Sequence, residues 1–369
     1  MKKITSIFLI NLLVWASVAG QRNVVEVSQS FPSADVEFVY IASIYGNITV
    51  TGDAGEETTV VVQVTGDENL PESRIRELLE EHYSIGFPFS DGRIDVIAFP
   101  RERRDRSAEE LSFNIVINIP AGVGTNIQTR GGNISVSSFT GFFPPPRQGI
   151  GDHPTFHRDQ VTARFETLNG SLMLDNVSGN NVTGIASGGN IYLNNSQANN
   201  FSFETKGGSI SVSNVIGRGN VRLTASGGSV SLNHFSGNIA AFTYGGNVSA
   251  NDVRGNLAVM TSGGNVNINQ FIGQVLATTS GGSLNVEMLS VIRRVQLINT
   301  GGNISLTLPA KVGFTLDVST SGGVSTTNMQ HFSGSVSDRT LNGNVWEGGP
   351  DIEIQGQQAN LIFRELTFR

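Results

Sequence analysis

The feature that most constrains this chain is a pair of glycines that recurs along most of its length. From residue 169 onward, successive pairs, or Asn-Gly in two copies, are 18 to 21 residues apart. Such a short, regular period indicates a stacked repeat array. A β-propeller is disfavoured, because its blades take about 40 residues each. The glycine pairs are Gly131 and Gly132, Gly188 and Gly189, Gly207 and Gly208, Gly227 and Gly228, Gly245 and Gly246, Gly263 and Gly264, Gly281 and Gly282, Gly301 and Gly302, and Gly322 and Gly323.

The residues after each glycine pair alternate between apolar and polar. An Asn or Ser comes first, followed by apolar residues two positions apart, as in Ile210 and Val212 or Val266 and Ile268. A period of two predicts a β-strand with one face turned inward. A second alternating segment follows about ten residues later, as at Leu257 and Val259. Each repeat therefore contributes at least two strand segments to the array.

These observations predict an all-β fold, a single-stranded parallel β-solenoid (β-helix) with about eleven coils of 18–21 residues. Equivalent strands of successive coils would pair in parallel about 4.8 Å apart. Glycine adopts φ > 0 without a Cβ clash, so we predict that the pairs from Gly131 and Gly132 to Gly301 and Gly302 are structural corners. Thr often lies two places before a pair, as at Thr261, and is interpreted as a corner residue.

Residues 1–20 have the features of a secretory signal peptide. Lys2 and Lys3 precede a mainly apolar run, and small residues follow at 17–20. The run is shorter than the ~20 apolar residues that span a bilayer, which favours a removable signal over a membrane anchor. We therefore predict a mature chain without a transmembrane segment, exported to the periplasm, the cell surface or the medium.

The charge balance and the lack of cysteine exclude several functions. With no Cys in the chain, there is no disulfide, no Cys-ligated zinc and no thiol nucleophile. Loss of Lys2 and Lys3 with the signal would move the formal net charge from −7 to −9. Only Lys206 and Lys311 would remain as lysines, which argues against nucleic acid or anionic lipid as a partner.

The rest of the chain divides by composition. Residues 21–120 are predicted to be a β-structured lead-in, in which 67–110 form a charged insertion with a short amphipathic helix near 71–83. Residues 121–349 are the repeats, interrupted at 141–160 by a loop whose consecutive prolines prevent regular strand pairing. Residues 350–369 lack glycine pairs and are predicted to cap the open core, as solenoid ends require.

The loop at 141–160 is the one segment with candidate contact residues: Phe142, Phe143, Arg147, His153 and His157. They could meet a partner or pack back on the solenoid, and the latter is the more common use of such residues. His153 and His157 have a spacing that aligns two metal ligands on a helix, but Pro154 disfavours a helix there. We predict no metal site and no cofactor.

A catalytic site is not indicated. Between residues 169 and 345 the acids are Asp175, Glu204, Asp252, Glu287, Asp317 and Asp338. They fall at different offsets within their repeats, whereas general acid–base catalysis needs two groups held at one scissile bond. We expect a non-enzyme.

Two segments carry a family resemblance. Ile-Asn-Ile-Pro-Ala-Gly-Val at 117–123, Thr-Arg-Gly-Gly-Asn-Ile-Ser-Val at 129–136 and Thr-Ser-Gly-Gly-Asn-Val at 261–266 resemble the bacterial putative-adhesin family of secreted β-solenoid domains with no assigned activity. The resemblance covers roughly 110–345, with 35–66 also similar, and the segments 67–110 and 141–160 depart from it. It implies the solenoid fold and supplies no catalytic residues.

Two functional hypotheses remain. The first is an exported, non-enzymatic adhesin or cell-envelope scaffold that binds an envelope protein or a glycan. The second is a carbohydrate-binding or carbohydrate-active β-helix protein, which three or more acids and an aromatic side chain converging in one groove would favour.

Overall fold

The computed structural model describes residues 23–67, 70–101, 111–141 and 162–364. Within these residues the fold is all-β, apart from one α-helix and one short 3-10 helix, which confirms the predicted class. The chain forms two compact units, residues 1–180 and 181–369. The predicted boundary between lead-in and repeats, at 120–121, therefore lies inside the first unit.

Strands of the first unit form two stacks. In one stack β1 and β4 are antiparallel, β4 is antiparallel to β8, and β8, β3, β10 and β13 then follow in parallel. In the other, β5 and β6 are antiparallel to β7, and β7, β2, β9 and β12 are parallel. The elements are β1 (Val24–Pro32), η1 (Ser33–Asp35), β2 (Phe38–Tyr45), β3 (Ile48–Thr51), β4 (Glu57–Thr65), α1 (Glu72–His82), β5 (Tyr83–Gly86), β6 (Phe89–Ser90), β7 (Arg93–Pro100), β8 (Ser112–Asn118), β9 (Gly124–Gly131), β10 (Ile134–Ser137), β11 (Thr140–Gly141), β12 (Thr162–Thr167) and β13 (Leu172–Asp175).

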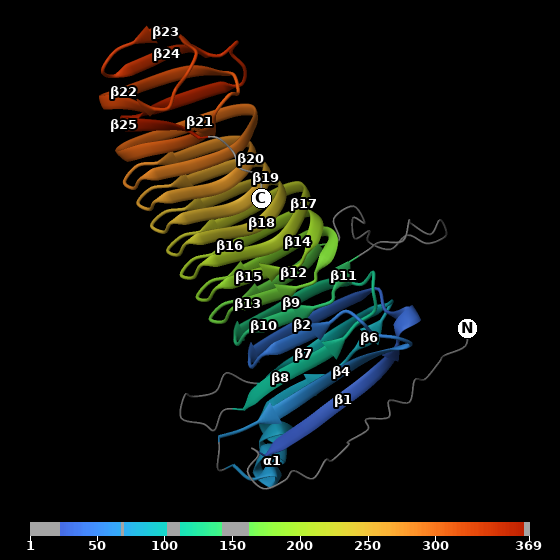
Figure 1. The fold of residues 1–369 in the computed structure, drawn as a ribbon. Coiled ribbons are helices and arrows are strands. Elements are labelled where there is room, and N and C mark those ends of the chain that lie inside the picture. Colours follow the sequence, from blue (N-terminus) through green and yellow to red (C-terminus); the bar gives the residue numbers. More distant parts are fainter. Residues whose placement is uncertain (1–22, 68–69, 102–110, 142–161, 365–369) are drawn as a thin grey trace. The chain divides into compact units, whose positions relative to one another are not determined.

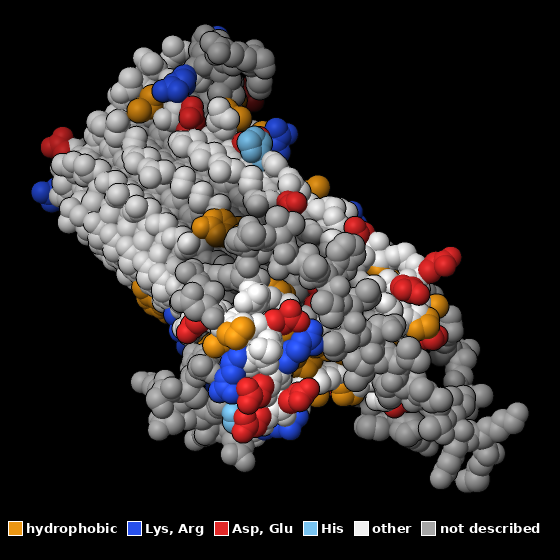
Figure 2. Space-filling view, turned by 90° about the horizontal axis from the view of Figure 1, so that it is seen from below, with side chains coloured by type: hydrophobic (Ala, Val, Ile, Leu, Met, Phe, Trp, Pro, Cys, Tyr) orange, Lys and Arg blue, Asp and Glu red, His pale blue; other side chains and the backbone are white. Residues whose placement is uncertain are grey.

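The segment 67–110 is only partly the insertion that the sequence predicts. Its helix is confirmed as α1, which buries Ile75 and Leu78. Its outer face carries both charges, seen together from below in Figure 2, and they form short-range pairs such as Arg76 with Glu72 at 2.7 Å. The same segment also contributes β7, which pairs in parallel with β2 and continues the stack. Residues 102–110 lie outside the described part.

Most of the second unit is a stack of parallel strands (Figure 1). β15 and β16 pair with β17, and β17, β18, β19, β20 and β21 then follow in chain order, all in parallel. The elements are β14 (Ser178–Ala186), which crosses the boundary between units, β15 (Ile191–Asn194), β16 (Gln197–Thr205), β17 (Ile210–Ala225), β18 (Val230–Thr243), β19 (Val248–Thr261), β20 (Val266–Thr279), β21 (Leu284–Pro309), β22 (Phe314–Thr327), β23 (Phe332–Val336), β24 (Thr340–Val345) and β25 (Asp351–Arg364). Inward positions repeat from coil to coil, so that Val248, Val266 and Leu284 are in register and fully buried.

Backbone crowding explains the second glycine of each pair. A Cβ on Gly264 would lie 1.9 Å from the carbonyl oxygen of Gly246 in the preceding coil, whereas the nearest atom to a Cβ on Gly263 is 3.6 Å away. The expectation of φ > 0 at these pairs is wrong for Gly264 and holds for Gly132, at +147°. The pairs 301–302 and 322–323 fall within the long strands β21 and β22. At the first of them, Asn299 Oδ1 accepts from the amides of Gly301 and Gly302 and Asn299 Nδ2 donates to the Gly282 carbonyl.

Two further turn positions recur in several coils, and the glycine-pair pattern does not predict them. A non-glycine residue adopts a left-handed φ five places after the Asn or Ser: Asn176, Asn195, Asn214, His234, Asp252 and Gln270, all between 48° and 56°. In three of these coils a glycine with positive φ follows, at Gly237 (136°), Gly255 (128°) and Gly273 (141°). Each of these three coils therefore has two turns in addition to its glycine pair.

Side chains at the glycine turns bond one coil to the next. Thr261 Oγ1 donates to the carbonyl of Gly246 over 2.9 Å and accepts from the amide of Gly264 over 3.2 Å. Thr167, Thr205, Thr243 and Thr279 make the same pair of bonds in their coils, and all are buried. The Asn after the pair also bonds to the next coil, since Asn247 Oδ1 accepts from the amide of Asn265 over 2.8 Å. This explains why Asn or Ser stands there.

The C-terminal strand is not the predicted cap. β25 pairs in parallel with β21 on one side and with β22 on the other. Antiparallel strands lie beyond β22 instead, because β24 pairs with β22 and β23 pairs with β24. β25 therefore lies inside the stack, between β21 and β22, and β24 and β23 lie beyond β22.

Candidate functional site

The outward side chains of the strands that lead into the glycine turns form one surface of the second unit, called the lateral face below. It comprises the outward positions of residues 221–225, 239–243, 257–261, 275–279, 294–299 and 351–356, which are in register from coil to coil. The intervening residues, such as Leu257 and Val275, are buried. Strand alternation therefore fixes which side chains reach this face.

An apolar patch occupies the middle of the lateral face, formed by Phe242, Met260 and Leu276 together with Tyr244, which begins the glycine turn after β18. The exposed fractions of Tyr244, Met260 and Leu276 are 66%, 51% and 40%. Phe242 is in register with Met260 on the next coil, and the Arg222 guanidinium lies 4.7 Å from the Phe242 ring centroid. Large apolar side chains exposed in adjacent register positions are characteristic of interaction surfaces.

The strand segments just after the glycine turns present a different surface. Their outward residues are Ser211, Ser213, Ser231, Asn233, Ser249, Asn251, Asn267 and Asn269. Side chains on this surface bond to one another along the stack, as when Asn269 Nδ2 donates to Asn251 Oδ1 over 2.9 Å. The apolar patch is thus a local departure from the polar composition of the repeat.

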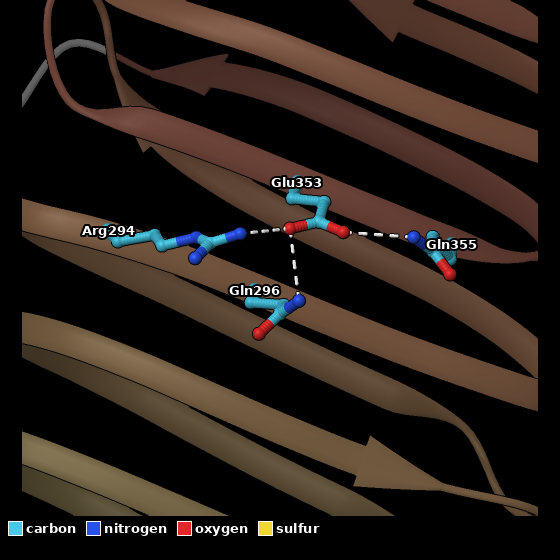
Figure 3. Close-up of polar contacts among 4 residues, drawn as sticks. All are labelled: Arg294, Gln296, Glu353 and Gln355. Atoms are coloured by element: carbon cyan, nitrogen blue, oxygen red, sulfur yellow. Dashed lines mark hydrogen bonds and ion pairs between the residues drawn. The ribbon is translucent and has the colours of Figure 1, made fainter.

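A polar cluster centred on Glu353 lies further along the lateral face (Figure 3). Arg294 Nη2 and Gln296 Nε2 both donate to Glu353 Oε2, the latter over 3.0 Å, and Gln355 Nε2 donates to Oε1 over 2.9 Å. The Glu353 side chain is only 19% exposed. Glu353 Oε2 therefore links β25 to β21, while Oε1 is bonded within β25.

The positions of the acids bear on both catalysis and metal binding. Asp317 is in register with Glu353 because β25 lies beside β22, a neighbourhood that repeat offsets alone could not reveal. Asp252 lies 3.7 Å from both His234 Nε2 and Arg254 Nε. Within the described part of the chain, no three His, Asp or Glu side chains gather as metal ligands.

The residues singled out from the sequence are only partly accounted for. Phe142, Phe143, Arg147, His153 and His157 all lie outside the described residues. The apolar patch was not predicted from the sequence, although its signal was present: the outward positions at 242, 260 and 276 are Phe, Met and Leu where neighbouring coils have Thr or Ala. No helix in the described residues is long and apolar enough to cross a membrane.

The repeat, the glycine turns and the stacked parallel strands agree with a comparison to known families. Residues 30–356 match the family model Toastrack DUF4097. The chain belongs to the Toastrack DUF4097 family. This confirms the resemblance drawn from the glycine-pair motifs. The chain matches no curated protein.

Three solved structures are similar to this member of the Toastrack family at low identity. A putative adhesin from Parabacteroides distasonis is 14% identical, covering 74% of this chain and 96% of its own, with a TM-score of 0.39. A putative adhesin from Parabacteroides merdae is 9% identical, covering 92% and 96%, with a TM-score of 0.32. A putative cell adhesion protein from Clostridium sporogenes is 9% identical, covering 92% and 99%, with a TM-score of 0.22. These scores are too low to transfer a mechanism or a site.

Proposed function

We propose that this Toastrack protein is an exported, non-enzymatic, single-stranded parallel β-solenoid of about eleven coils that serves as an adhesin or cell-envelope scaffold. Its mature chain would follow the predicted signal peptide at residues 1–20. The partner would be an envelope protein or a glycan, bound without metal or cofactor. The adhesin names of the similar structures support this direction and no more.

The apolar patch is the observation that carries the proposal. Phe242, Met260 and Leu276 expose apolar surface on strands whose backbone is fixed by pairing on both sides, and Tyr244 adds an exposed ring in the turn directly after β18. Binding to such a surface requires little ordering of the protein, which lowers the entropic cost of association. Aromatic and Met side chains with a nearby Arg are also the types enriched in protein–protein interfaces.

The alternative is a carbohydrate-binding or carbohydrate-active protein. Tyr244 and Phe242 offer rings on which a sugar could stack, and Arg222 and Thr224 offer hydrogen-bond donors nearby. An active enzyme is less well supported, because Glu353 has both oxygens hydrogen-bonded within the fold. Binding of a glycan without cleavage is therefore the second candidate.

Repeat-guided substitutions test the patch without altering the fold. Phe242→Thr and Met260→Thr copy Thr224 and Thr278 in the same register, and Leu276→Ala copies Ala240 and Ala258. We expect the triple variant of the mature chain to lose at least ~10-fold in binding to isolated envelope fractions, as loss of several interface anchors would, and to keep its thermal midpoint.

The control is a substitution on the polar strands, Asn267→Ser, which copies Ser249 in the neighbouring coil. It should bind envelope fractions as the wild type does. Equal binding by wild type, triple variant and control would contradict the proposed interaction surface. A glycan array probed with the same three proteins separates a protein partner from a sugar.

A further inference from the structure

β25 occupies a gap that its place in the sequence does not predict. It pairs in parallel with β21 and with β22, so that Val295, Ile352 and Leu316 lie in register across three strands. Elsewhere in the second unit, parallel register partners are 17 to 20 residues apart, but Gln296 and Glu353 are 57 residues apart. The last described strand therefore inserts between two strands that precede it in the chain.

The contacts of β25 are extensive and do not depend on the chain that leads to it. Ile352, Ile354 and Leu361 are fully buried. On the surface, Arg294 and Gln296 bind Glu353, and Arg364 Nη1 donates to Glu287 Oε1 over 3.2 Å. All these groups would find the same partners if β25 came from another copy of the chain.

The connection that delivers β25 is short and strained. β24 ends at Val345 and β25 begins at Asp351, which leaves five residues, 346–350. Trp346 adopts φ 54° and Gly348 adopts φ 80°, and a left-handed φ is a genuine outlier for a bulky residue such as Trp. The Trp346 amide donates to the His331 carbonyl over 2.8 Å, and the centroids of the two rings are 3.9 Å apart. Short, strained hinges favour domain swapping.

We propose that two copies of this protein exchange β25, so that Asp351–Arg364 of one copy fills the gap between β21 and β22 of the other. The exchange keeps every strand contact of β25, and the connection that crosses between copies no longer holds Trp346 in the left-handed conformation. This goes beyond the proposed function, because the partner is the chain itself and the surface is the strand gap rather than the apolar patch.

The absence of native Cys allows a direct test. Thr307 and Ile362 are register partners on β21 and β25, and both side chains are half-buried on the outer side of the sheet. Mature chains carrying Thr307→Cys and Ile362→Cys separately, with different affinity tags, are co-expressed, purified through both tags and treated with a short bismaleimide. Exchange predicts a covalent dimer joining the two variants. Either variant expressed alone should give several-fold less.

A matched pair controls for chance collisions. Ser231 and Ser249 are register partners on β18 and β19, outside the exchanged segment. Ser231→Cys and Ser249→Cys, co-expressed in the same way, should give no covalent dimer, whereas the two substitutions placed in one chain should link within that chain. Absence of a doubly tagged complex, or a complex that links no better through 307 and 362 than through 231 and 249, would overturn the proposal.

The connection between β24 and β25, residues 346–350, gives a second test of the exchange. Trp346→Gly removes the steric cost of the left-handed φ, so the closed monomer should become more stable relative to the exchanged dimer. The dimer fraction measured by analytical ultracentrifugation should then fall several-fold. Trp346→Phe keeps a bulky residue at that φ and should keep the dimer fraction. A dimer fraction that is the same in all three proteins would contradict exchange driven by this hinge.

Discussion

Gly263 and Gly264 are neighbours in one pair, yet they have different steric environments. A Cβ at Gly263 would make ordinary contacts, the nearest at 3.6 Å, but one at Gly264 would overlap the Gly246 carbonyl. The second glycine is therefore required by the stacking distance between coils. The positions of these pairs were predictable from the sequence, but the φ-based reason applies to Gly132 rather than to Gly264.

We expect Gly264→Ala to lower the free energy of unfolding by about 1–3 kcal/mol, because the methyl group forces two backbones apart. Gly263→Ala should change it by less than about 0.5 kcal/mol, as for an uncrowded surface site. Thermal and urea unfolding of the two variants measure the difference. Equal losses would mean that crowding is not the reason for the glycine.

The buried Thr at the turn gives a second prediction at this scale. Thr261→Val keeps the shape but leaves the Gly246 carbonyl and the Gly264 amide without their partner. An unsatisfied buried group costs about 1–3 kcal/mol, so the thermal midpoint should fall. The chain has its own comparison, because Ala225 takes the Thr position in register with Thr243. Ala225→Thr should not destabilise, and a clear loss there would contradict the proposed role of the hydroxyl.

At the scale of elements, strand register was predictable because burial alternates with a period of two. Ile268 is fully buried, as its position predicts, and the Asn267 amide faces outward, where its Oδ1 accepts from Asn285 Nδ2 over 2.9 Å. The helix α1 was predictable from its own period, because Ile75 and Leu78 lie three residues apart on one face.

Ile268→Asp should therefore destabilise the chain by about 3–5 kcal/mol, because it leaves an unpaired charge in the core. Asn267→Asp keeps an acceptor oxygen at the surface and should be nearly neutral. Soluble yield and thermal midpoint compare the two, and similar losses would mean that this register is wrong.

The elements that the sequence did not predict depend on long-range or unusual backbone geometry. β25 carries no glycine pair, so its position between β21 and β22 follows from contacts 57 residues apart rather than from a period. The turns at His234, Asp252 and Gln270 use three different residue types at one left-handed position. No single-residue pattern marks such a turn.

At the scale of the whole molecule, the chemistry of the described residues is distributed in a way that suits binding. Apolar side chains gather on one part of the lateral face, and the neighbouring strands carry Ser and Asn, of which several bond to one another. Several charged groups sit in local pairs, such as Arg164 with Glu166 at 2.8 Å. A surface of this kind can bind a partner through shape and apolar contact, without a charge-based mechanism.

The last prediction follows from that distribution: the purified mature chain should cleave no glycan. General acid–base cleavage needs two carboxyl groups at one bond. Asp317 and Glu353 are acids in register on neighbouring strands, but Glu353 is already bound by Arg294, Gln296 and Gln355. A panel of polysaccharides assayed for new reducing ends and for unsaturated products measures turnover, with the Glu353→Gln variant in parallel. Wild type and variant should both give background rates. Turnover that is present in the wild type and lost in Glu353→Gln would instead place a carbohydrate-active site on the lateral face and reject the scaffold proposal.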